Sequence, residues 1–519
     1  MSRWHVPSAD LDRELDGFEF PPHFDFGVST SGYQTEGGYN TPTGPKNNWY
    51  WLEARGKIET TGDSSRFLEM YEEDFTRAQW LGANAFRLGI EWARMQPGVD
   101  PALTAPPPFS PDAARMYARI LAASFAHGMF PAVTLWHFTH PLWAGADFWL
   151  DWGRVEEWFG AYLEYSISEI NRLLVEEHHQ PPIPYYITMN EPINVPMAGY
   201  LLGVFPVGRK GRREAGLAYA NILRAHILAY RMVNRIYRER NWPRPTVTIN
   251  TWVAAPYSFD KIAQDLFLAR AAGVSREGVP AMLSEQRERL RAHLADCPYL
   301  RGPQWFKRQL DRAADRTIWK ALTPETIDPL LDMIYAGDEP RLTDVVGIDL
   351  YDPFIGNNFD FPVTVRSKPY QWNANPHVFH KFLEAYEWLA GETPIHLLEH
   401  GMCHRMVGNR VYPHVNGLSR DQELKEAMLE VVRSIRAGRR LQSFYYWSLV
   451  DNYEWGSYEP RFGLFGVDFA NGARRLPVDV AGSNAAGAFR LFAEAFRARD
   501  KQALREVFQT AKYPEYSKP

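Results

Sequence analysis

Short apolar runs recur along the chain, and longer stretches with helical periodicity separate them. The runs show little alternation of polar and apolar residues, which is typical of strands buried on both faces in a parallel sheet. They predict eight strands, at residues 24–31, 84–90, 130–136, 185–189, 246–250, 345–350, 394–399 and 442–449.

The stretches between these runs predict helices. Residues 69–82 have apolar positions at helical spacing and end at a glycine, and residues 219–237 repeat the spacing. Eight strands that alternate with helices indicate an α/β fold, a (β/α)8 TIM barrel. We expect a single domain over residues 1–519, with a barrel core at about 20–480. The proline-rich stretch 101–111 is interpreted as a loop within it, because helical periodicity resumes directly afterwards.

The longest connection, residues 251–344, lies between the fifth and sixth predicted strands. It has amphipathic stretches of its own at 283–294 and 305–322. An insertion at this point follows the carboxyl end of a strand, so it belongs over the C-terminal face of the barrel. We expect helices packed on the rim. The alternative is a lid or membrane-contacting element that shapes what enters.

Composition narrows the class of protein. Of 519 residues, 45% are hydrophobic and 23% charged, as in an ordinary globular protein. A net charge of −5 gives no basic surface for nucleic acid, so no nucleic-acid partner is expected. The N-terminus has no continuous apolar signal region, no run is long enough to span a membrane, and two cysteines cannot form a disulfide framework. These features predict a cytoplasmic protein without a cofactor.

Two acids stand where a barrel enzyme would need them. Glu191 directly follows the fourth predicted strand, and Glu399 closes the seventh. Cleavage of a glycosidic bond with retention requires a protonated and an ionised carboxyl group about 5–5.5 Å apart. Acids that end two strands of one barrel lie at the same rim, although each could also be a capping or salt-bridged residue. The 18 tryptophans favour a carbohydrate ligand only slightly, because a large core also contains Trp.

Six motifs resemble, in order, those of glycoside hydrolase family 1, the β-glucosidase-like retaining barrel enzymes. The resemblance extends from about Phe24 to about Leu476. The motifs are FDFGVSTSGYQTEGG, FRLGIEWARMQP, AVTLWHFTHPLW, TMNEP, LLEHG and YYWSLVDNYEWGSYEPRFGLFGVDF. One short motif could arise by chance, but six in the right order are specific. The resemblance indicates a divergent member of the family.

The resemblance implies a role for each matching residue. Glu191 would be the general acid/base and Glu399 the nucleophile, with Arg87 and Tyr351 beside it and Asn190 on the sugar 2-hydroxyl. The residues implied to contact the sugar are Gln34, His137, Trp447, Glu454, Trp455 and Phe462. Gln34 and Glu454 together would bracket the 4-hydroxyl, which suits gluco and galacto configurations.

Three positions depart from the family pattern. Phe138 and His400 stand where the family usually has Trp and Asn, and Asp349 stands where its sixth strand usually carries Asn. Because Asp349 and His400 end neighbouring strands, we hypothesise that they form an ion pair in place of two neutral amides. Two independent substitutions are the alternative.

Other candidate sites are weaker. His137/His140 and His400/His404 have spacings that a helix could use for a metal, but both pairs lie at strand exits, so no metal is predicted. Glu454 argues against a phosphorylated sugar because a carboxylate would repel the phosphate. The basic stretch 207–216, with its charges at 209–213, is either an anion contact or a solvated turn.

The sequence thus predicts a retaining β-glycosidase that hydrolyses terminal non-reducing β-D-glycosyl residues through a covalent glycosyl-enzyme. Its expected partner is a small-molecule β-glycoside; lipid or membrane contact enters only through the alternatives, and no oligomeric state is predicted. A transglycosidase with a lipid or alcohol acceptor is a rival on the same site. A non-catalytic sugar-binding barrel is a second rival. A barrel that had lost catalysis would be expected to have lost Glu191 or Glu399, and both are present.

Overall fold

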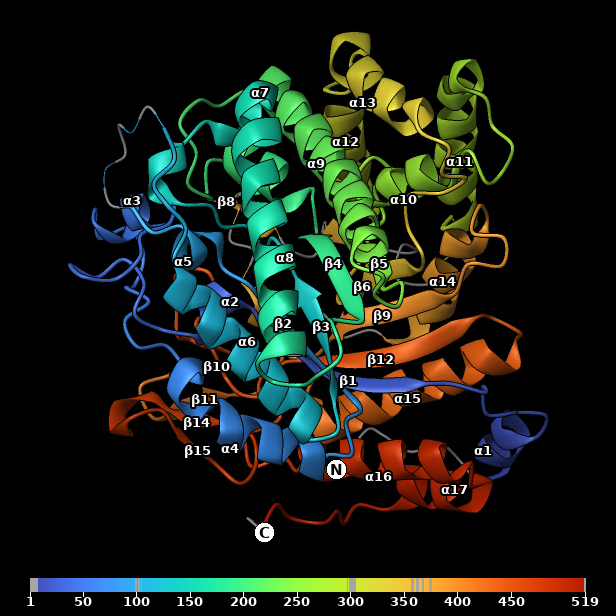
Figure 1. The fold of residues 1–519 in the computed structure, drawn as a ribbon. Helices are drawn as coiled ribbons and strands as arrows, with labels where there is room; N and C mark the ends of the chain where they lie inside the picture. The colour runs from blue at the N-terminus through green and yellow to red at the C-terminus, as the bar shows by residue number, and fades with distance from the viewer. Residues whose placement is uncertain are drawn as a thin grey trace.

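Eight parallel strands close into a barrel, and helices surround it in the computed structural model (Figure 1). The structure describes residues 8–98, 100, 103, 105–295, 297, 305–355, 359–360, 364–365, 368–372 and 376–517. The barrel strands are β1 Asp25–Ser29, β2 Ala85–Gly89, β3 Phe130–Thr134, β4 Tyr185–Asn190, β5 Thr246–Trp252, β6 Val346–Asp349, β9 Ile395–His400 and β12 Leu441–Trp447. Each predicted strand is confirmed within two residues at either end, and β1 pairs with both β2 and β12 to close the barrel.

A long helix follows each barrel strand, as the predicted fold class requires. These helices are α4 Phe67–Trp80, α6 Pro111–Ala126, α8 Gly160–Glu176, α9 Arg212–Glu239, α13 Pro324–Ala336, α14 Phe379–Glu387, α15 Arg420–Arg436 and α16 Ala485–Ala498. Local sequence fixes several of their starts. Ser110 caps α6 by accepting from the Ala113 N–H, with Pro111 at the first helical position, and Ser419 and Gln422 form a capping box at α15.

Shorter elements complete the chain. The remaining helices are α1 Ser8–Leu15, α2 Gly32–Thr35, α3 Tyr50–Glu53, α5 Trp92–Met95, α7 Trp152–Arg154, α10 Lys261–Leu268, α11 Val279–His293, α12 Trp305–Trp319 and α17 Lys501–Gln509. Small sheets that the apolar pattern did not predict contain β7 Phe359–Asp360, β8 Thr364–Val365, β10 His404–Val407, β11 Arg410–Tyr412, β13 Pro460–Arg461, β14 Val467–Asp468 and β15 Arg474–Arg475. Their strands are two to four residues long, too short to carry a periodic signal.

The insertion between the fifth and sixth barrel strands is confirmed as helical. It contains α10, α11, α12 and then α13, and α11 and α13 stand at the upper right of Figure 1. Strand β5 runs on to Trp252, so the first two residues of the predicted insertion belong to the barrel. Of the predicted loop 101–111, residues 101, 102 and 104 lie outside the described residues.

Two hydrophobic cores hold the barrel. The larger lies between the strands and the surrounding helices, and a smaller one fills the lower barrel interior around Tyr185, Leu398 and Tyr445. Gly27 is required there, because a Cβ on it would stand 2.3 Å from the Tyr445 ring. The filled interior leaves polar side chains to gather at the carboxyl end of the strands. Among the described helices, none is both long and apolar enough to cross a membrane.

Candidate active site

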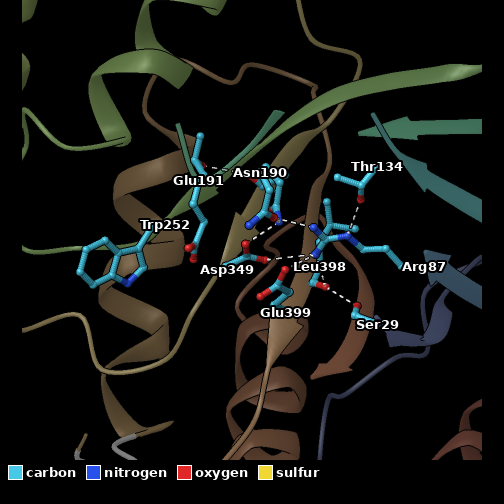
Figure 2. A network of polar contacts seen from close by, with 12 residues as sticks. Ser29, Arg87, Thr134, Asn190, Glu191, Trp252, Asp349, Leu398 and Glu399 are labelled. Atoms are coloured by element: carbon cyan, nitrogen blue, oxygen red, sulfur yellow. Dashed lines mark hydrogen bonds and ion pairs between the residues drawn. The ribbon is translucent and has the colours of Figure 1, made fainter. Parts of the chain in front are cut away.

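Glu399 points into the barrel from β9, where two donors hold its carboxylate. Arg87 Nη1 on β2 lies 2.5 Å from Oε1, and the Tyr351 hydroxyl donates to Oε2 at 2.9 Å. Arg87 is fully buried and also donates to Thr134 Oγ1 at 3.1 Å and Asn190 Oδ1 at 2.5 Å. The guanidinium is therefore fixed on three sides, and it fixes Glu399 in turn (Figure 2).

Glu191 follows β4 directly and faces Glu399 from across the barrel mouth. Its backbone has φ = 36°, a left-handed conformation that is strained for a residue with a side chain. The Glu191 N–H donates to the Asn250 carbonyl at 2.8 Å, and the Asn194 amide donates to its carboxylate. One carboxylate oxygen from each of Glu191, Glu399 and Asp349 lies within 4.8 Å of the others. This spacing is near that of a retaining pair and well below the roughly 6.5–9.5 Å of an inverting pair.

The surroundings separate the acidities of these carboxyl groups. Burial raises the pKa of Glu191 well above its usual value, and the charges of Glu399 and Asp260 raise it further. Burial also raises the pKa of Glu399, but Arg87 and the Tyr351 hydroxyl oppose that rise. As pH rises, Glu399 therefore loses its proton first, and Glu191 keeps its proton to higher pH.

Asp349 is the third carboxyl group of the cluster. Its backbone is in register with Glu399, so its side chain points into the same barrel mouth. The Asn250 amide donates to Asp349 Oδ2 at 2.5 Å, and Arg87 Nη1 lies 3.9 Å from Oδ1. Burial, followed by the charges of Glu399 and Glu191, raises the pKa of Asp349 well above its usual value.

The hypothesis that Asp349 and His400 form an ion pair is wrong. His400 Nε2 lies 2.6 Å from Glu423 Oε1 on α15, and Nδ1 lies 2.7 Å from the Leu350 carbonyl. The reason is strand geometry: Glu399 points into the barrel, so its neighbour His400 points outward to the helices. The two departures therefore lie on opposite faces of the barrel wall.

The His400–Glu423 pair gives a stability prediction. Both side chains are buried, so His400→Asn leaves the Glu423 carboxylate without a cation and should destabilise the fold by roughly 3–5 kcal/mol. Burial opposes the imidazolium, but Glu423 and the Leu350 carbonyl outweigh it and raise the pKa of His400 above its usual value. The stabilisation is thus complete below pH of about 6.5 and lost as pH rises through the raised pKa. Urea unfolding at several pH values measures this effect. Additive losses in a cycle with Glu423→Gln would contradict the pairing.

Polar groups implied to contact a sugar gather beside the two glutamates. Gln34 Nε2 donates to Glu454 Oε2 at 2.9 Å, and Gln34 Oε1 accepts from Ser31 at 2.7 Å. Asn190 Nδ2 lies 3.4 Å from His137 Nε2, whereas His137 Nδ1 is buried without a partner among the described residues. Burial raises the pKa of Glu454 to about 8, with a smaller contribution from Glu399. The site thus presents donors and acceptors suited to hydroxyl groups.

Aromatic rings form the remaining wall. His137 stacks between Trp447 and Trp455, at centroid distances of 5.8 and 5.7 Å. Phe138, the departure at the third strand, packs on Trp455 at 5.0 Å. Phe462 lies in a buried cluster with Tyr351, Cys403 and Trp447.

Several residues of the site were missed by sequence reasoning. Asn250 lies two residues before the end of β5 and donates to both Asn190 and Asp349, and Asn194 donates to Glu191. Trp252, the last residue of β5, stands beside Glu191 in Figure 2. A polar residue at the carboxyl end of the fifth strand was a usable signal for Asn250. Nothing in the sequence marked Phe205, which reaches Trp455 from the connection after β4.

The basic stretch and the histidine pairs considered in the sequence have partners nearby. Arg209 of the basic stretch donates to Asp147 at 3.2 Å and is largely exposed, which favours the surface turn. His140 contacts the Gly145 carbonyl rather than a second histidine. In the described part of the chain, the one cluster with metal-ligand geometry is Glu191, Asp349 and Glu399. The guanidinium of Arg87 already supplies a cation to that cluster.

A pair of facing carboxyl groups at the C-terminal rim of a parallel barrel, with aromatic walls, defines the class of barrel glycosyl hydrolases. The family model described as "Glycosyl hydrolase family 1" matches residues 17–272 and 352–480. The chain belongs to this family, as a divergent member.

Known relatives agree with this assignment. The chain is 24% identical to Beta-glucosidase 42 of Arabidopsis thaliana, over 89% of this chain and 92% of the relative. It is 25% identical to a 6-phospho-beta-galactosidase of Lacticaseibacillus rhamnosus, over 87% and 94%. The structure of a β-glucosidase from Thermotoga maritima with castanospermine superposes with a TM-score of 0.65 at 21% identity, covering 92% of this chain and 98% of the other. This likeness shows the shared barrel fold.

Proposed function

We propose that the protein is a retaining β-glycosidase for terminal non-reducing β-D-glycosyl residues of gluco or galacto configuration. The observation that carries the proposal is the carboxyl pair, with Glu399 held by Arg87 and Tyr351 and Glu191 kept protonated by burial. Membership in the family and β-glucosidases among the relatives support it.

The proposed reaction has two displacements. Glu399 attacks the anomeric carbon while Glu191 passes its proton to the leaving oxygen, which gives a glycosyl-enzyme ester and an ionised Glu191. Glu191 then takes a proton from water, whose oxygen attacks the anomeric carbon and releases Glu399 as a carboxylate. In this proposal Asn190, which accepts from Arg87, binds the 2-hydroxyl, and the charge of Arg87 keeps the departing carboxylate ionised.

Product stereochemistry tests the proposal. Nitrophenyl β-glucoside and β-galactoside should both be hydrolysed, and NMR should show the β-anomer of the sugar as the first product. A first-formed α-anomer would overturn the retaining assignment. The partly buried Glu454, with Gln34 at 2.9 Å, should bind a free 4-hydroxyl, and above its pKa of about 8 its carboxylate should repel a phosphorylated sugar. Faster turnover of a 6-phospho-glycoside than of the neutral glycoside above that pH would contradict this part.

Transfer to an apolar alcohol or lipid is a second candidate function. Leu202 and Val204 are 41% and 50% exposed and precede Phe205 in the chain, whose ring lies 5.8 Å from Trp455. Such an apolar edge fits an apolar aglycone or acceptor. The ratio of alkyl glycoside to free sugar, measured with added long-chain alcohol, distinguishes transfer from hydrolysis.

Asp349 gives a pH prediction. Turnover requires ionised Glu399, so it falls as pH drops through that pKa, and it requires protonated Glu191, so it falls as pH rises through the Glu191 pKa. The charges of Glu399 and Glu191 raise the Asp349 pKa, so Asp349 ionises after both and stays neutral through the two limbs. Asp349→Asn should therefore leave both limbs of kcat/KM nearly unchanged.

A matched control exists for this measurement. His400 is another position that departs from the family pattern, and its side chain lies on the outer face of the barrel. The pH profile of His400→Asn should therefore stay like that of the parent. Both profiles are measured at a temperature where both variants are folded. A basic limb that moves to lower pH in Asp349→Asn, but not in His400→Asn, would contradict an Asp349 that ionises after Glu191.

A further inference from the structure

Helices α11 and α12 of the insertion enclose a cavity with the loop 255–257. Helices α11 and α12 lie in the part of the chain, 273–351, between the two stretches matched by the family model, whereas the loop 255–257 lies within the first matched stretch. The helical wall of the cavity is therefore outside the family match. Its volume is about 60 Å³, against roughly 10–15 Å³ needed for one water on the same measure.

Four arginines dominate the cavity wall. Helix α11 contributes Arg287 and Arg291, and α12 contributes Arg308 and Arg312, so each helix places two guanidinium groups four residues apart on one face. Asp311 and Asp315 are the acids of the lining, which leaves four cations against two anions. Like charges at this spacing repel each other, and a bound anion would remove the repulsion.

The two less exposed arginines are anchored by neighbours. Arg287 Nη2 lies 2.6 Å from Asp315 Oδ2, and its guanidinium stacks on the Trp319 ring at 4.6 Å. Arg308 Nη2 donates to the Ala295 carbonyl at 2.8 Å, while its Nε is buried without a hydrogen-bond partner among the described residues. Anchored guanidinium groups with unused N–H donors are preorganised for a ligand.

The two outer arginines keep most of their donors. Arg291 pairs with Glu288, an exposed residue one turn earlier on its own helix, at 2.8 Å. Arg312 is exposed and has no ion pair or hydrogen bond to any residue that the structure describes. Exposed pairs of this kind are weak and exchange readily for a better acceptor.

We propose that this cavity is a binding site for an oxyanion of the phosphate class. Phosphate and sulfate oxygens match the planar fork of a guanidinium, and several such forks converge on this space. Trp252 stands beside Glu191 (Figure 2), and the loop 255–257 that lines the cavity begins three residues later, so the cavity is connected to the carboxyl end of β5. The anion is therefore either free in solution or carried by the aglycone; the aglycone assignment rests on the proposed function.

Direct binding tests the site without any turnover. Calorimetric titration of the full chain with inorganic phosphate, and separately with sulfate, should show saturable binding. The variant Arg291→Gln/Arg312→Gln should weaken it at least tenfold. Arg316→Gln, an exposed arginine on α12 outside the cavity lining, is the matched control and should bind like the parent. Both removed side chains are exposed, and thermal unfolding confirms that the variants fold. No binding by the parent, or equal binding by the double variant, would overturn the proposal.

Kinetics separate the two sources of the anion. For an aglycone with a phosphate group, kcat/KM should fall at least tenfold in the double variant while that for the neutral nitrophenyl glycoside stays unchanged. Loss of phosphate binding with no change in either rate assigns the site to a free anion. Failure of the proposed glycosidase function would appear differently, as absent turnover of neutral glycosides by a parent that still binds phosphate.

Discussion

Replacing Glu399 by Gln should reduce turnover of aryl β-glycosides by roughly 10⁴-fold or more, as loss of a nucleophile does in other hydrolases. The amide has nearly the same shape, but it cannot attack the anomeric carbon and cannot pair with Arg87, which lies 2.5 Å from the carboxylate. Because the site is buried, no solvent anion replaces the lost charge easily. Steady-state kinetics on nitrophenyl glycosides measure the effect.

Two controls sharpen the Glu399 experiment. Glu392→Gln changes an acid that is 95% exposed just before the same strand, and should leave turnover unaltered. Incubation of the parent with a 2-deoxy-2-fluoro glycoside should place one label on the peptide that contains Glu399, read by mass spectrometry. Full turnover in Glu399→Gln, or a label on another residue, would reject the nucleophile assignment.

Removing the second carboxyl group should have a substrate-dependent effect. Glu191→Ala is expected to lower turnover of poor leaving groups by about 10²–10⁴-fold, the usual contribution of a general acid/base. Dinitrophenyl glycosides need no protonation, so with them the first step should persist and the glycosyl-enzyme should accumulate, because no base activates water.

Chemical rescue distinguishes catalysis from structural damage in this variant. Azide needs no general base and fits the space that the side chain leaves, so it should restore turnover and yield a β-glycosyl azide. Glu177→Ala, which removes an acid that is 52% exposed at the end of α8, should show neither the loss nor the rescue. Azide-independent rates in Glu191→Ala would contradict its role as the base.

The two carboxyl groups were predictable because each closes an apolar strand. In a parallel barrel all strands end at one rim, so the order of strands alone brings Glu191 and Glu399 to the same face. The family resemblance implied that Arg87 and Tyr351 lie beside Glu399, and both donate to it. The position of Asn250 at the end of the fifth predicted strand could have marked it as a residue of the rim, but its two partners, Asn190 and Asp349, could not be predicted because they come from strands far away in sequence.

The pairing of His400 shows where sequence reasoning ended. Adjacent residues of a strand face opposite sides, and the partner that claims His400, Glu423, lies in the outer helix α15. The partner of an outward-facing strand residue depends on how that helix packs, which the strand pattern does not contain. Asp349 faces the inside of the barrel, so its carboxylate joins those of Glu191 and Glu399 instead.

The sequence by itself determined the barrel, the order of its strands, the helical insertion and the rim on which the acids stand. Those features depend on local periodicity and on the rule that parallel strands end together. Only the tertiary structure decided which partner each charged group has, the acidity of the three carboxyl groups, and the meeting of four arginines between α11 and α12. The physical reason is that ion pairing and desolvation depend on distances between side chains remote in sequence, which chain packing alone fixes.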